Sequence, residues 1–168
     1  MISIASLSFN FDPIEDRIRL IGNMSNGQQR VDFWMTRRLV TRLLKASSGL
    51  IKQTSTQVNQ VPVEHRPAMA QFEHDQAQQT QTVQQEANLT HDDYPADLLK
   101  RLDISFQEER YSLSFFVGGE ETPYAQSILS YDEMHQILFW LHKGSLKLEW
   151  GVPEILFDTS TNTTQRLQ

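Results

Sequence analysis

Histidine is the residue type in this chain best suited to acid–base chemistry, and five histidines occur. His91 precedes two carboxylates in the run His91-Asp92-Asp93, and a carboxylate can fix the tautomer of an imidazole. Neighbours in sequence seldom orient each other in this way, and no serine lies in a G-x-S-x-G turn that would complete a triad. We interpret the run as a polar turn and predict no catalytic residue.

Metal and cofactor sites lack their usual sequence patterns. His135 and His142 are seven residues apart, whereas two zinc ligands on one helix need a spacing of three or four. The chain has no cysteine, which excludes disulfides, thiolate zinc sites and a cysteine nucleophile. No glycine-rich loop of the phosphate-binding kind is present, and no two carboxylates are spaced as an acid and a base. We expect no metal, no cofactor and no enzymatic activity.

Basic side chains gather around one predicted helix and are the best candidates for binding nucleic acid or another anion: Arg30, Arg37, Arg38, Arg42 and Lys45. Trp34 or Tyr111, if exposed on a sheet, could stack on unpaired bases. The isoelectric point of about 5.3 counts against nucleic acid, because domains that bind it are usually basic. The alternative interpretations are a solvated helix face or pairing with acidic residues elsewhere in the molecule.

The net charge of −6 is distributed unevenly along the chain. Residues 1–52 hold eight basic and four acidic side chains, a net charge of +4, whereas residues 53–96 and 97–168 each carry −5. The two signs either neutralise each other, within one molecule or across a dimer, or they attract an anionic partner to the basic part. The sequence favours neutralisation.

The elements that position these residues form two similar units in an α+β fold. In residues 1–52, alternating apolar residues predict strands at 2–11, 17–20 and 31–35, with a bend near Ala5-Ser6 and a turn at Asn26-Gly27. A helix follows, capped by Thr36 and ended by Gly49. The first unit is therefore β-β-β-α.

Residues 97–156 repeat this plan in pattern but not in residue identity, which favours an internal duplication over the coincidence of a common motif. Strands are expected at about 102–106, 111–117 and 124–129, followed by a helix with a capping box from Ser130 to Glu133. The helix should bury Met134, Ile137, Leu138 and Leu141 and end at Lys143-Gly144, before a last strand through Leu146, Leu148 and Trp150. We expect one compact domain in which the strands form one or two antiparallel sheets and the helices pack on one face.

The joint between the units, residues 53–96, is rich in glutamine, with ten in positions 53–85. Pro67 suits the first turn of a helix over about 67–87, whose apolar residues are too sparse to bury alone. Packing on a second copy would stabilise it, so we expect a homodimer. Residues 157–168 are expected to be a frayed tail.

These features predict a non-enzymatic binding or assembly module that acts through protein–protein contacts. The alternative is single-stranded nucleic-acid binding by the basic first helix. Trp34, Phe72 and Trp140 are the candidate interface residues, because tryptophan and other large apolar side chains anchor interfaces. The sequence has neither a membrane-spanning apolar run nor a recognisable signal peptide, so a cytoplasmic protein with no membrane partner is expected.

Overall fold

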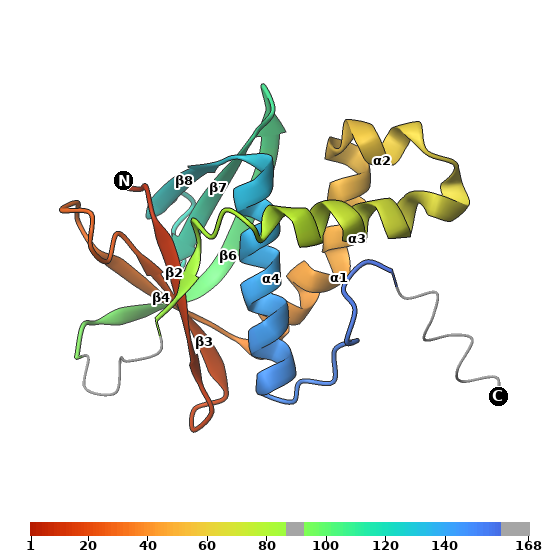
Figure 1. Ribbon diagram of the computed structural model, residues 1–168. Helices are drawn as coiled ribbons and strands as arrows, with labels where there is room; N and C mark the ends of the chain where they lie inside the picture. Colours follow the sequence, from red (N-terminus) through yellow and green to blue (C-terminus); the bar gives the residue numbers. More distant parts are fainter. Residues whose placement is uncertain (87–92, 159–168) are drawn as a thin grey trace.

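The computed structural model describes residues 1–86 and 93–158. The fold is mixed α+β, with a curled sheet on one side and the helices gathered on the other (Figure 1). The strands are β1 (Ile2–Ile4), β2 (Leu7–Asp12), β3 (Arg17–Gly22), β4 (Val31–Met35), β5 (Gln84–Gln85), β6 (Ala96–Gln107), β7 (Arg110–Val117) and β8 (Ala125–Leu129). The helices are α1 (Arg37–Thr54), α2 (Thr56–Gln60), the 3₁₀ turn η1 (Val63–His65), α3 (Arg66–Ala77) and α4 (Tyr131–Lys147).

All eight strands belong to one sheet, in the order β1-β8-β7-β6-β4-β3-β2-β5. Two antiparallel meanders, β2-β3-β4 and β6-β7-β8, meet where β4 pairs in parallel with β6. The expectation of antiparallel sheets is therefore wrong in part, since β1 with β8 and β2 with β5 are parallel as well. Parallel pairing of β4 and β6 is possible because the connection between them is long and contains α1, α2 and α3.

The N-terminal segment links the two ends of the curled sheet. It bends at Ala5-Ser6, as predicted, so that β1 pairs with β8 while β2 pairs with β3. Asn23, with a positive φ of 59°, bridges the bend: its Oδ1 accepts from the backbone N–H of Ala5 at 2.9 Å and its Nδ2 donates to the Ser3 carbonyl at 2.8 Å. A side-chain amide thus supplies bonds that the interrupted strand does not make.

Helix α4 packs against β7 and β8 of the sheet and against the helices α1 and α3 (Figure 1). Its predicted capping box is confirmed, because Glu133 N–H donates to Ser130 Oγ and Ser130 N–H donates to the Glu133 carboxylate. The four predicted core residues, Met134, Ile137, Leu138 and Leu141, are buried. The predicted end at Lys143-Gly144 is wrong: Gly144 is a helical residue packed against Phe11, where no larger side chain fits.

The strand expected after α4 is also absent from the described residues. Leu146 is still helical, Leu148 is the C-cap, and Glu149 with a φ of 59° turns the chain. Trp150 is buried, and its indole N–H donates to the Asp16 carboxylate at 2.7 Å. Alternation over three residues was too short to distinguish a strand from a helix end.

Helix α1 begins where predicted, with the Leu39 N–H donating to Thr36 Oγ1. It continues past Gly49 to Thr54, so the predicted end at Gly49 is wrong. The buried stripe is Val40, Leu44, Ser47 and Ile51. Ile51 in particular requires the extra turn, because it is fully buried.

The glutamine-rich joint folds into α2, η1, α3 and β5 rather than one helix over 67–87. Pro67 lies in the first turn of α3, as expected, but the helix ends at Ala77 and Gln81 has a φ of 46°. The buried stripe of α3 is Ala70, His74 and Ala77. Phe157, which the sequence analysis placed in the frayed tail, is instead buried; His91 and residues 159–168 lie outside the described ranges.

Candidate functional site

Helix α1 is the most basic element of the chain. It carries five basic side chains and no carboxylate: Arg37, Arg38, Arg42, Lys45 and Lys52. Within residues 1–86 and 93–158, none of the five has an ion-pair partner. In the part of the chain that the structure describes, these five side chains are therefore not neutralised by direct ion pairs, whereas Arg17, Arg19 and Arg30 of the same basic third are paired with Glu15 or Asp32.

The helical period assigns the side chains of α1 to different flanks. The buried stripe around Val40 and Leu44 faces the core. Arg37, Thr41, Lys45 and Ser48 lie on one side of this stripe, because residues three, four or seven positions apart share a helix face. Lys45 lies furthest from the stripe, toward solvent. Leu39, Leu43 and Leu50 lie on the opposite side.

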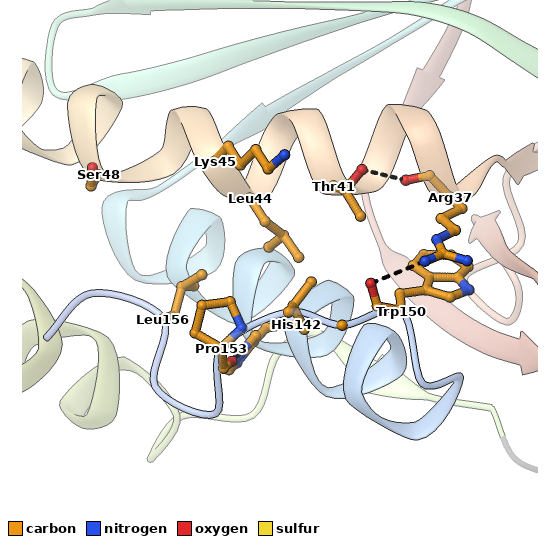
Figure 2. Close-up of a pocket in the computed structure, with 11 residues that line it drawn as sticks. Arg37, Thr41, Leu44, Lys45, Ser48, His142, Trp150, Pro153 and Leu156 are labelled. Atoms are coloured by element: carbon orange, nitrogen blue, oxygen red, sulfur yellow. Dashed lines mark hydrogen bonds between the residues drawn. The ribbon is translucent and has the colours of Figure 1, made fainter. Parts of the chain in front are cut away.

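A pocket of about 370 Å³ opens beside the first of these flanks (Figure 2). Its walls are α1, His142 of α4 and the segment that follows α4. The polar and basic lining side chains are Arg37, Thr41, Lys45, Ser48 and His142, and the apolar ones are Leu44, Trp150, Val152, Pro153 and Leu156. The volume lies in the range of small-ligand sites.

Hydrogen bonds hold the segment that forms the far wall. The Arg37 guanidinium reaches from α1 to donate to the Trp150 carbonyl at 3.3 Å (Figure 2). His142 Nε2 lies 2.6 Å from the Pro153 carbonyl, so Nε2 carries the proton and donates. These two bonds, with that from the Trp150 indole to Asp16, fix the wall at three points.

The pocket combines positive charge with an apolar floor. None of the described residues that line it carries a carboxylate. The Thr41 hydroxyl donates to the Arg37 carbonyl at 2.8 Å and His142 is held by the Pro153 carbonyl, so these two side chains do not form a nucleophile–base pair. The arrangement is suited to binding an anionic group attached to an apolar one.

The predicted basic residues are not all brought together. Arg37 and Lys45 line the pocket, Arg42 lines a groove on the opposite flank of α1, and Arg38 is exposed. Arg30 precedes β4, so the whole strand separates it from α1; it pairs with Asp32 and its guanidinium lies 4.4 Å from the Tyr94 ring centroid.

The three predicted interface residues lie in different environments. The Arg17 guanidinium covers the ring of Trp34 at 3.8 Å from its centroid. Trp140 donates its indole N–H to the Val83 carbonyl at 2.8 Å and packs edge-on against Phe139. Phe72 on α3 is 53% exposed and is the most accessible of the three.

Sequence reasoning missed the far wall of the pocket. Trp150 was placed in a strand, and Pro153 and Leu156 were not considered as site residues. Gly151-Val152-Pro153 did carry a signal, because a glycine and a proline close together mark an irregular segment. This segment returns to α1 because α4 continues past Gly144 to Lys147, which the sequence did not predict.

A second polar cluster joins α1, α3 and α4. Glu73 accepts from the Ser55 hydroxyl at 2.7 Å and from the Tyr131 hydroxyl at 3.2 Å. Burial raises the pKa of the Tyr131 phenol, so it stays a hydrogen-bond donor. Since each group already has a partner on a neighbouring helix, the cluster connects helices and is not a free acid–base pair.

In the described residues, no group of three or more histidine, aspartate or glutamate side chains could hold a metal ion. None of the helices there has the length and apolar character required to cross a membrane. Comparison of the chain with family models, curated proteins and solved structures found no match. The inferences below therefore depend on the site itself.

Proposed function

We propose that this protein is a non-enzymatic binding module that makes protein–protein contacts through α1, with the adjoining pocket receiving an acidic segment of the partner. The observation that carries the proposal is the set of five cations on α1 with no ion-pair partner among the described residues. In a chain of net charge −6, such a helix attracts a negatively charged surface selectively.

The pocket supports a more specific description of the ligand. Arg37 and Lys45 would pair with carboxylates, while Leu44, Val152 and Leu156 would contact an apolar side chain beside them. An acidic stretch interrupted by a leucine or a similar residue combines both features. The same charges would hold it more weakly as salt concentration rises.

Single-stranded nucleic acid is the second candidate, because the cations of α1 would also neutralise phosphates. The two stacking residues that the sequence suggested, Trp34 and Tyr111, are not available for this role. Tyr111 is fully buried, and the Trp34 ring is covered by Arg17. Non-specific single-strand binders combine a basic groove with exposed aromatic side chains, so an acidic polypeptide fits better.

Fluorescence anisotropy with three labelled probes tests the proposal. The probes are a short peptide with leucine flanked by glutamates, the same peptide with glutamines, and a single-stranded oligonucleotide. We expect the glutamate peptide to bind at low salt at least about tenfold more tightly than the glutamine peptide, a difference of about 1.4 kcal/mol. Tighter binding of the oligonucleotide than of the glutamate peptide would favour the second candidate, and binding of none would refute both.

We also infer that the chain arose by internal duplication. β2-β3-β4-α1 and β6-β7-β8-α4 follow the same order, and in both a single hydroxyl residue, Thr36 or Ser130, connects the third strand to the helix as its N-cap. Superposition of the two series of Cα atoms tests this inference. Related units should superpose over the third strand and the helix together, and unrelated ones would diverge there.

A further inference from the structure

The core face of the sheet is left partly uncovered along β6. Leu102, Ile104 and Phe106 lie directly opposite Phe115, Leu113 and Tyr111 of β7, and opposed residues of an antiparallel pair point to the same face. The three β7 residues are at most 1% exposed, whereas their β6 partners are only half-buried. The partly exposed strip of the core face along β6 is therefore apolar.

Helix α1 forms the other side of the same opening. Its flank opposite the basic pocket presents Leu39, Leu43 and Leu50, which are half-buried. With Leu102 and Ile104 these residues line a groove of about 330 Å³. The groove is therefore a continuous apolar surface between a helix and a strand, which is typical of a protein contact.

The groove has ends of opposite charge. β6 begins beside β4, which leads directly into α1, and Arg38 and Arg42 are exposed in the first two turns of that helix. Near the end of β6 the ring of Phe106 packs on Tyr111, and the Tyr111 hydroxyl bonds to Thr54 at the end of α1. The acidic turn Glu108-Glu109 therefore lies at the far end from the two arginines, and Arg110 next to it leaves that turn with a net charge of −1.

Neither set of charges forms ion pairs with other described residues of the same molecule. Arg38, Arg42, Glu108 and Glu109 have no ion-pair partner among the residues that the structure describes. Two copies related by a twofold axis across the groove would run antiparallel, so each basic end would meet the acidic end of the other copy. The apolar residues would then cover one another.

We propose that the α1–β6 groove is the contact face of a symmetric homodimer, with Arg42 of each copy placed against the Glu108-Glu109 turn of the other. The acidic-peptide pocket lies on the other flank of α1, so the two sites have separate linings, although Arg42 is also one of the five cations that support the proposed function. It also differs from the dimer contact expected from the sequence, which used the glutamine-rich joint and Phe72.

Sedimentation velocity over a range of concentrations tests the dimer. We expect the full chain to dimerise and Leu43→Asp, a half-buried position, to weaken dimerisation at least about tenfold. Phe72→Asp on α3 is the matched control and should leave dimerisation unchanged. A monomer at every concentration, or a dimer disrupted by Phe72→Asp and not by Leu43→Asp, would overturn the proposal.

Charge exchange tests the antiparallel arrangement without altering the apolar residues. Arg42→Glu alone and Glu109→Arg alone should each weaken the dimer, because each brings like charges together. The double variant should restore dimerisation toward that of the wild type. Additive weakening in the double variant would exclude this pairing. Near-ultraviolet circular dichroism of each variant establishes that the fold is retained.

Discussion

The Nδ1 atoms of His74 and His135 lie 2.9 Å apart in the core between α3 and α4. Only one of the two nitrogens can donate, so the other must be unprotonated. Phe157 packs edge-on against both rings, and neither histidine is more than 2% exposed. The accepting imidazole is therefore neutral, and burial disfavours a positive charge on the donating one as well.

The pair predicts a loss of stability on acidification. Burial lowers the pKa of His74 to about 3 and that of His135 to about 4, and the charges of His135 and His142 contribute to the lower value. The unfolded chain, with histidine pKa values near 6.5, binds more protons between these limits, so its free energy falls relative to the folded state as pH decreases. The free energy of unfolding should fall from pH 6.5 downward by up to about 1.4 kcal/mol per pH unit for each histidine.

Urea unfolding between pH 7.5 and 5 measures this slope above the range in which most carboxylates titrate. His135→Gln should be less stable than the wild type at pH 7 and should show a smaller slope. His65→Gln, at an exposed position of η1, is the control and should leave the slope unchanged. Equal slopes in all three proteins would contradict a neutral buried pair.

Two helical glycines should respond oppositely to alanine. At Gly144 a Cβ would lie 2.5 Å from Phe11 Cε1, so Gly144→Ala should destabilise the protein by about 1–3 kcal/mol. At Gly49 an added Cβ would meet no atom within 4 Å, so Gly49→Ala should stabilise the protein by up to about 1 kcal/mol through helix propensity. Thermal unfolding compares the two, and a Gly144→Ala protein as stable as the wild type or more stable would refute the close packing of α4 on β2.

Asp32 is the buried centre of an arginine cluster. Its carboxylate accepts from Arg19 Nε at 2.7 Å and from Arg30 Nε and Nη2 at 2.8 Å. Asp32→Ala should cost about 3–5 kcal/mol, because it leaves buried positive charge without this carboxylate. Asp103→Ala removes the exposed pair with Arg101 and should cost at most about 1 kcal/mol. If urea unfolding showed that Asp32→Ala costs no more free energy of unfolding than Asp103→Ala, the buried cluster would contribute little to stability.

The sequence predicted those features of the fold that depend on residues close together in the chain, such as the starts of α1 and α4. The hydroxyl caps Thr36 and Ser130 marked both helix starts because a cap depends on residues within one turn. The helix ends were missed because Gly49 and Gly144 resemble C-terminal glycines, and their role depends on what lies beside them: solvent for one, Phe11 for the other. The parallel pairing of β4 with β6 involves residues too distant in sequence for any local pattern to indicate.

The candidate site was predicted in part for the same reason. Arg37 and Lys45 were identified because helical spacing and charge are visible in the sequence. Their association with the segment from Trp150 to Leu156 was not, since it requires α4 to extend past Gly144 and turn at Glu149. His74 was overlooked as a core residue because a polar side chain interrupts the expected apolar stripe of α3.

The affinity of the glutamate peptide for two variants of equal charge tests the central claim most directly. Arg37→Ala with Lys45→Ala removes two cations from the pocket, and Lys100→Ala with Lys147→Ala removes two from exposed positions elsewhere. Isothermal titration at low salt should show binding weakened at least about tenfold in the first variant and at most about twofold in the second. Equal weakening in both variants would contradict the assignment of the acidic partner to this pocket.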